Sequence, residues 1–155
     1  MIDMKSKHDN IAEYILYLWQ MEDYLRAFPE QSEVTRELSE LNEMMHREGI
    51  VDSGHLQLAN NALEELEDLH SQLLNEDAIY RATIIRLQPS LNLLKAKTDR
   101  PTMSDIEACL ILLYQIMMLR LQNREISPET ASVQARATQV LQFLSKVYHD
   151  NQTAI

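Results

Sequence analysis

The sequence predicts an all-α protein, a compact bundle of about six helices that forms a single domain over residues 1–155. Apolar residues recur at the helical spacing of about 3.6 residues, and no segment alternates in the manner of a β-strand. Short connections separate the periodic segments, which favours antiparallel packing of neighbouring helices. The length of 155 residues also fits one domain with a substantial core.

The first two predicted helices have recognisable ends. The first covers residues 9–27 and stops before Pro29, because proline disfavours the helical conformation in the residue that precedes it. The second covers residues 32–48. We expect Ser32 to be its N-cap and Gly49 to be its C-terminal cap, since these residue types are favoured at those positions.

The next two predicted helices carry continuous apolar stripes. The third begins after the candidate caps Asp52 and Ser53 and runs to about Leu74. The fourth covers residues 77–96 and contains Pro89. Because the apolar stripe continues in phase across this proline, and Pro89 points away from the stripe, we expect one kinked helix and not two helices.

The last two predicted helices have the clearest starts. The fifth begins with a capping box, in which Ser104 and Glu107 occupy the two required positions, and it ends near Asn123. The sixth begins at Ser127, with Pro128 at the first helical position.

The first and fifth predicted helices are apolar on almost every side, unlike the others. A helix of this kind is buried on all sides, either by its own chain or by a partner. We therefore expect these two helices at the centre of the bundle. Because a chain of this size covers two such helices with difficulty, part of their surface is a candidate homodimer interface.

The charge of the chain argues against two classes of partner. Acidic residues outnumber basic residues 24 to 14, which gives a formal net charge of −10, and no dense cluster of Lys and Arg occurs. Such a surface repels the phosphates of nucleic acids and anionic membranes. We therefore expect neither nucleic acid nor membrane among the partners.

Two further features predict a soluble, cytoplasmic protein. The longest apolar stretch, residues 108–121, is shorter than the about 20 residues that a membrane-spanning helix needs, and the polar first ten residues lack the apolar core of a secretion signal. The lone cysteine, Cys109, lies inside this apolar stretch. It is expected to be a buried, reduced thiol of the kind that cytosolic proteins carry.

Three polar side chains are predicted to point into the bundle. A helical wheel places Glu22, His70 and Arg120 among apolar residues of their helices. Because an unpaired buried charge is costly, Glu22 and Arg120 are expected to pair, with His70 nearby. Such a cluster is either a ligand-binding or proton-handling site or a structural salt bridge, and Arg26 is an alternative partner for Glu22.

His55 is a weaker candidate. It follows Gly54 and lies in the first turn of the third predicted helix. An imidazole beside free backbone N–H groups could help to bind an anion there. The alternative is an ordinary turn residue.

The spacing Glu-x-x-His, which can form part of a di-metal site, occurs twice. The pairs are Glu43 with His46 and Glu67 with His70. Ferritin-like bundles hold two metal ions with such pairs. However, Glu43 points away from its apolar stripe, and the two motifs lie on consecutive helices. We predict no metal and no cofactor, and a di-metal carboxylate bundle is retained only as a third alternative.

Several segments resemble an uncharacterised bacterial, all-helical family that carries a domain-of-unknown-function label. They are NIAEYILYLWQMED at 10–23, REGIVDSGHLQ at 47–57, DLH at 68–70 and LRLQNREIS at 119–127. These segments contain all four candidate residues named above. The resemblance implies a helical bacterial protein and supplies no activity.

The leading functional prediction is a non-enzymatic helical module that acts through protein contacts, including contacts with a second copy of itself. It follows from the excess of apolar helix surface and from the lack of a complete catalytic set of residues. The alternative is a small-molecule-binding protein or an enzyme built around Glu22, His70 and Arg120.

Overall fold

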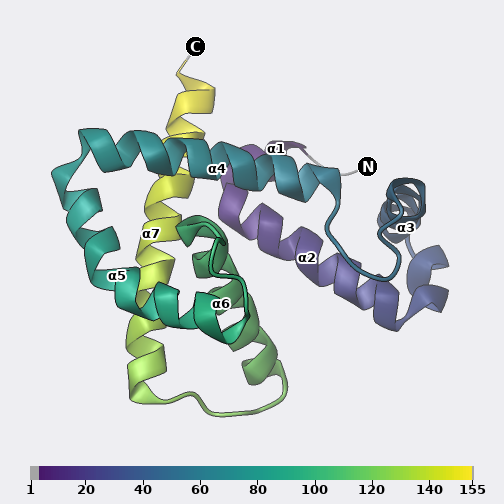
Figure 1. The fold of residues 1–155 in the computed structure, drawn as a ribbon. Coiled ribbons are helices and arrows are strands. Elements are labelled where there is room, and N and C mark those ends of the chain that lie inside the picture. The colour runs from purple at the N-terminus through teal and green to yellow at the C-terminus, as the bar shows by residue number, and fades with distance from the viewer. Residues whose placement is uncertain (1–3, 155) are drawn as a thin grey trace. The chain divides into compact units, whose positions relative to one another are not determined.

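The structure, a computed structural model, describes residues 4–154 of the chain and the side chains of residues 6–154. Within these limits the chain forms helices and no strand, which confirms the all-α prediction. The helices α2 to α7 correspond to the six predicted ones. In chain order the elements are α1 (Met4–Asp9), α2 (Ile11–Ala27), the 3-10 helix η1 (Pro29–Glu33), α3 (Arg36–Glu48), α4 (Gln57–Glu76), α5 (Ala78–Lys97), α6 (Asp105–Leu121) and α7 (Pro128–Thr153) (Figure 1).

Side-chain caps define where most of these helices begin. The side-chain oxygens of Asn10, Thr35, Asp77, Ser104 and Ser127 each accept a hydrogen bond from the backbone N–H three residues later. These bonds satisfy N–H groups that have no partner inside the helix. The predicted caps of the last two helices are therefore confirmed.

The predicted start of the second helix is wrong. Ser32 lies inside η1, which begins at Pro29, and α3 starts only after Thr35. The extended backbone of Thr35, with φ −131° and ψ 158°, ends one helix type and lets its hydroxyl cap the next. Gly49 is the predicted C-cap, with φ +70°, a conformation that favours glycine.

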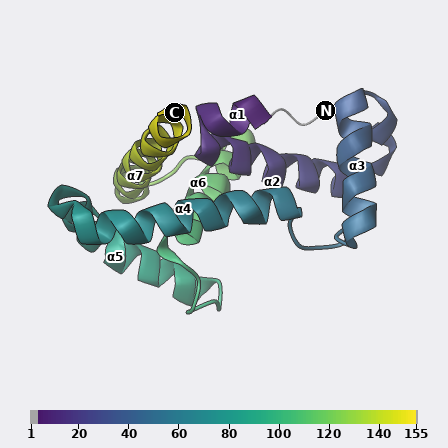
Figure 2. The ribbon, with the colours of Figure 1, turned by 90° about the horizontal axis from the view of Figure 1, so that it is seen from above.

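The chain divides into two compact units, Met1–Glu65 and Leu66–Ile155. The single domain over residues 1–155 stays a prediction. In the first unit, α2 is the central helix and packs against α1, η1 and α3. Figures 1 and 2 show α3 lying across the C-terminal end of α2. The buried residues of α2 are Ile11, Ala12, Tyr14, Ile15, Leu18, Trp19, Glu22 and Leu25.

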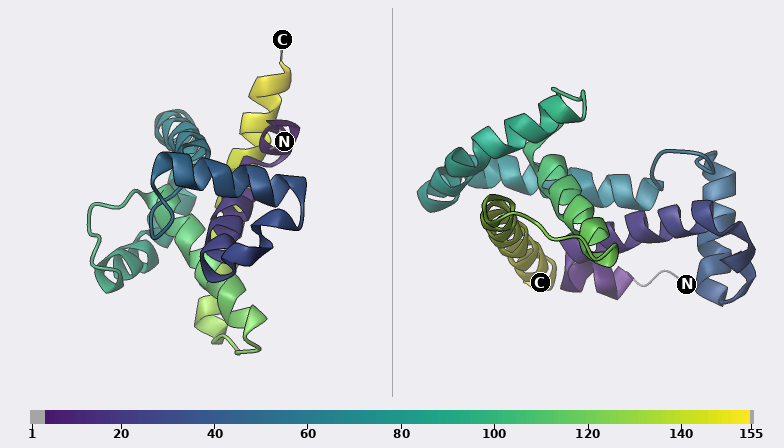
Figure 3. Two further views of the ribbon diagram at one scale, coloured as in Figure 1. Left: turned by 90° about the vertical axis from the view of Figure 1, so that its right-hand side faces the viewer. Right: turned by 90° about the horizontal axis from the view of Figure 1, so that it is seen from below.

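In the second unit, α5, α6 and α7 pack against one another in pairs. The helices α6 and α7 run antiparallel and are joined by the loop at residues 122–127 (Figures 1 and 3). The buried residues of α6 are Ile106, Ala108, Cys109, Leu110 and Ile116. The two helices predicted to be central, α2 and α6, thus each supply core residues to their own unit.

Two smaller predictions about the second unit are confirmed. Pro89 lies inside one continuous helix, α5, and is exposed. Cys109 is fully buried, and this burial raises the pKa of its thiol to about 12, so the thiol is protonated at neutral pH. None of the described helices combines the length and the apolar character needed to cross a membrane.

Candidate functional site

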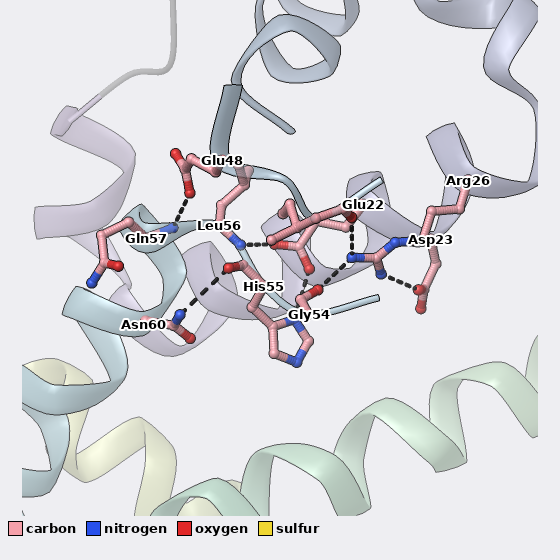
Figure 4. Close-up of polar contacts among 10 residues, drawn as sticks. Glu22, Asp23, Arg26, Glu48, Gly54, His55, Leu56, Gln57 and Asn60 are labelled. Atoms are coloured by element: carbon pink, nitrogen blue, oxygen red, sulfur yellow. Dashed lines mark hydrogen bonds and ion pairs between the residues drawn. The ribbon is translucent and has the colours of Figure 1, made fainter. Parts of the chain in front are cut away.

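Among the side chains of the first unit that the structure describes, Glu22 is the most buried charged one, with 1% exposed, as the helical wheel predicts. Its carboxylate binds the loop that connects α3 to α4. Oε2 accepts a hydrogen bond from the backbone N–H of Leu56 over 2.8 Å, and Oε1 lies 2.7 Å from Nδ1 of His55. Figure 4 shows these three residues meeting where α4 begins.

His55 is held from two directions. Its Nδ1 bonds to Glu22, and its ring stacks on Trp19 with a centroid separation of 4.8 Å and an interplanar angle of 22°. The His55 side chain is 41% exposed. A buried carboxylate therefore fixes the orientation of a partly exposed imidazole, as in the Glu–His pairs that enzymes use to orient a base.

Arg26 holds the same loop at two other points. Its guanidinium donates hydrogen bonds to the carbonyl oxygen of Ile50, over 3.0 Å, and to that of Gly54, and it also bonds to Asp23 (Figure 4). Gly54 has φ +97°, and an added Cβ would lie 3.3 Å from Ile50. A side chain at position 54 would therefore be strained by its backbone conformation and by contact with Ile50.

These contacts give the cluster a structural use. Glu22 accepts from the N–H of Leu56, and Glu48 accepts from the N–H of Gln57 over 2.8 Å, so two carboxylates cap the start of α4. Negative charge at a helix N-terminus is favourable because backbone N–H groups and the helix dipole point toward it. His55 lies in the loop before α4 and not, as was predicted, in its first turn, and the carboxylate beside it is Glu22, a side chain of the protein itself.

His70 has a different partner in the second unit. It is buried as predicted, and its Nδ1 lies 2.6 Å from the hydroxyl of Tyr80. The rings of the two residues meet edge to face. Burial raises the pKa of Tyr80, which stays a neutral phenol.

The prediction that Arg120 points inward is wrong. Arg120 is exposed and donates a hydrogen bond to Gln134 over 2.8 Å. It lies in the last turn of α6, where the long side chain reaches water while its stem stays near the helix. Each of the three predicted residues thus has a partner within its own unit: Glu22 binds His55 and Leu56, His70 binds Tyr80, and Arg120 binds Gln134.

The residues of the first Glu-x-x-His motif lie on the surface of α3. Glu43 and Arg47 form a surface ion pair of 3.6 Å, while His46 is exposed. Among the described residues, no group of three or more His, Cys, Asp or Glu side chains is placed to hold a metal ion.

The second unit contains a further polar network, which is partly buried. Asp105 accepts hydrogen bonds from Lys95 over 2.7 Å and from Gln88 over 3.0 Å. Burial raises the pKa of Asp105, but the bonds from Lys95 and Gln88 outweigh burial, so the net effect lowers this pKa below 3.8. The network joins α5 to the start of α6.

Stability of the second unit is expected to fall as the pH drops below about 6.5, because of His70. Burial lowers the pKa of His70, Lys95 lowers it further, and Asp105 acts in the opposite direction. The unfolded chain therefore takes up this proton first. The stabilisation is complete above the unfolded pKa of about 6.5 and is lost as the pH falls through the folded pKa.

The measurement is the free energy of unfolding from pH 7.5 to 4.5, in the wild type and in His70→Gln. The wild-type slope below about pH 6.5 is at most about 1.4 kcal/mol per pH unit from one proton, and the variant lacks this component. Asp105 titrates below this window. An exposed control, His46→Gln, should keep the wild-type slope, and an unchanged slope in His70→Gln would contradict the prediction.

The fold and the site define a small all-α protein in which the buried carboxylate of Glu22, on α2, caps the start of another helix, α4. The family model described as "Domain of unknown function (DUF4924)" matches residues 1–37 and 29–154. The chain belongs to this family, as the resemblance of its segments predicts. Comparisons with curated proteins and with solved structures gave no match.

The sequence predicts both Glu22 and His55 as candidate residues, but as members of separate sites, and it does not single out Trp19. The predicted caps Asp52 and Ser53 are wrong, because α4 begins only at Gln57. The N–H groups of Leu56 and Gln57 therefore take their acceptors from Glu22 and Glu48, and the sequence carries no local signal for that.

Proposed function

We propose that this chain is a non-enzymatic protein-interaction module that forms a homodimer. The observation that carries the proposal is an exposed stripe on α5 that combines apolar and basic residues. Ile79, Arg86 and Leu93 recur every seven residues, which places them on one side of the helix, and Lys97 continues the line. We call these four residues the α5 stripe.

The α5 stripe is unusual for a surface in contact with water. Ile79 is 81% exposed, Leu93 is also exposed, and Ile85 lies exposed on the same helix. Arg86 and Lys97 are exposed, and neither bonds to another side chain in the described part of the molecule. Large aliphatic side chains grouped with unpaired charges are typical of a surface that binds a protein.

A second surface of the chain has the complementary character. Phe28 and Val34 are exposed apolar residues on either side of η1, and the carboxylates of Glu30 and Glu33 are exposed between them. We call these four residues the η1 patch. Apolar groups can meet apolar groups, and Arg86 and Lys97 can meet Glu30 and Glu33, if the α5 stripe of one copy faces the η1 patch of another.

The complementarity favours a second copy of this chain as the occupant. Each copy carries both surfaces, so a twofold dimer makes the contact twice. Packing α5 on α5 of a partner would instead place Arg86 and Lys97 near their own copies, where like charges repel. The separate structural partners of Glu22, His70 and Arg120 give no support to a composite catalytic site and so favour this proposal over an enzyme.

A charge-swap experiment tests the homodimer. The first variant carries Arg86→Glu and Lys97→Glu, and the second carries Glu30→Lys and Glu33→Lys. In the homodimer of either variant, like charges face each other, so sedimentation velocity should show dimerisation weakened by about tenfold or more. An equimolar mixture should recover the dimer, because acid and base then face each other at both contacts.

Matched controls make the result specific. Lys146→Glu changes an exposed residue of α7 outside both surfaces and should leave dimerisation unchanged. A monomeric wild type, variants that dimerise normally, or a mixture that stays monomeric would each overturn the homodimer. Binding of the wild type to anionic vesicles but not to itself would redirect the α5 stripe to a membrane surface.

A further inference from the structure

A cavity of about 350 Å³ lies in the first unit where α1, the start of α2 and the start of α3 meet. Its volume falls in the range of small-molecule sites, which begins at about 300 Å³. The lining residues that matter are Asp9, Glu13, Tyr14, Tyr17 and Glu37. None of the surfaces assigned to the dimer lines this cavity.

The described residues that line the cavity carry a net negative charge. Asp9, Glu13 and Glu37 supply three carboxylates, and no lysine or arginine is among the lining residues that the structure describes. Several carboxylates around one hollow concentrate negative potential there and attract a cation. Acidic clusters are common on a chain of net charge −10, so the carboxylates alone do not make a site.

Two tyrosines add aromatic surface to the acidic cavity. Burial raises the pKa of Tyr17 to about 12, and the neighbouring carboxylate of Glu37 acts in the same direction, so the phenol stays neutral. Aromatic faces attract a cation through the ring quadrupole. Tyr14 and Tyr17 thus add apolar and cation-binding surface beside the carboxylates.

The hydroxyl of Tyr14 is the second independent observation. Tyr14 is only 4% exposed, and its hydroxyl oxygen is buried without a hydrogen-bond partner. Buried polar atoms are rarely left without a partner. Because Tyr14 is one of the residues that line the cavity, a group that enters it can supply the missing partner. Burial also raises the pKa of Tyr14, so its oxygen is a neutral acceptor.

We propose that this cavity binds a primary ammonium group. Such a cation has three N–H donors, which match the Tyr14 hydroxyl and the surrounding carboxylates, whereas a quaternary ammonium has no donor. The short alkyl chain of the amine lies against the tyrosine rings. A free aliphatic diamine and the side chain of lysine in a peptide share this chemistry.

Isothermal titration of the full chain tests the proposal with 1,5-diaminopentane as the probe. We expect saturable binding by this amine, and binding by tetramethylammonium or by neutral 1-pentanol at least about tenfold weaker, because neither matches the donors and the charge together. The second probe is Nα-acetyl-lysine N-methylamide, in which only the side-chain amine is free. Tighter binding of this compound assigns the site to a peptide lysine, and tighter binding of the diamine assigns it to a free amine.

Two variants test whether the amine binds in this cavity. Tyr14→Phe removes the unpartnered hydroxyl and keeps the ring, and Glu37→Gln removes one charge. Each should weaken binding by about tenfold, the effect of one hydrogen bond or charge of this kind. Tyr14→Phe should fold with wild-type stability, because its hydroxyl makes no bond in the folded chain.

Glu43→Gln is the matched control, since Glu43 is exposed on α3 and does not line the cavity. It should bind the diamine as the wild type does. The proposal is overturned if the amine does not bind at millimolar concentration, if the neutral or quaternary probe binds equally well, or if Tyr14→Phe and Glu37→Gln bind normally. The result is independent of dimerisation, which is read by sedimentation.

Discussion

Replacing Glu22 with alanine is expected to lower the free energy of unfolding by about 3 kcal/mol. The substitution leaves the backbone N–H of Leu56 without its acceptor and releases His55 from its orienting bond. Leu56 is itself fully buried, so water does not readily replace the carboxylate. The start of α4 also loses the negative charge that its dipole favours.

The measurement is urea-induced unfolding followed by the fluorescence of Trp19, which is the single tryptophan of the chain and stacks on His55. The matched control is Glu48→Ala, which removes the exposed cap of Gln57 and should cost only about 1 kcal/mol. Equal effects of the two variants would show that the burial of Glu22 adds nothing.

The same titration, followed also by circular dichroism, bears on the number of domains. Coincident transitions of the Trp19 signal and of the total helix signal would support the single domain that the sequence predicts. Separate transitions would show that the two units unfold independently.

The second large effect is expected at Leu110, a fully buried residue of α6. Leu110→Ala should lower the free energy of unfolding by about 3 kcal/mol, because it removes buried methyl groups and leaves a cavity that packed helices fill only in part. Leu121→Ala is the control on the same helix. Leu121 is 64% exposed, so its truncation should change stability by no more than about 0.5 kcal/mol.

The measurement is the urea midpoint of unfolding of each α6 variant, followed by circular dichroism. If the dependence of the free energy on urea is the same in both variants, the shift of the midpoint gives the change in stability. A loss of less than about 1 kcal/mol for Leu110→Ala would mean that the core around α6 collapses to fill the space. A large loss for Leu121→Ala would instead indicate that the exposed end of α6 is covered in the assembled protein.

The elements of the fold were predictable because each carries its own local signal. Periodicity gives the helices, and the side chains of Ser104 and Ser127 give their starts without any knowledge of the rest of the chain. The error at Ser32 arose in the same way. Ser32 and Thr35 can both cap a helix and lie close together. The 3-10 helix that begins at Pro29 contains Ser32, so Thr35 is the residue that caps α3.

The candidate site was predictable residue by residue but not as an arrangement. A helical wheel correctly places Glu22 and His70 inside because both lie in the middle of covered helices. It fails for Arg120, since a wheel treats every turn as equally covered and the last turn of α6 is not. The partner of a buried carboxylate depends on tertiary contacts, which periodicity does not encode.

The loop between α3 and α4 has fixed ends and a free middle. Arg26 binds the carbonyls of Ile50 and Gly54, and Glu22 binds the next turn, whereas residues 51–53 are exposed and make no hydrogen bond that the structure records. Insertions are tolerated best where no bonded backbone is displaced. The tip at 51–53 is therefore the natural place to splice in an epitope tag or a fluorescent protein without disturbing either anchored end.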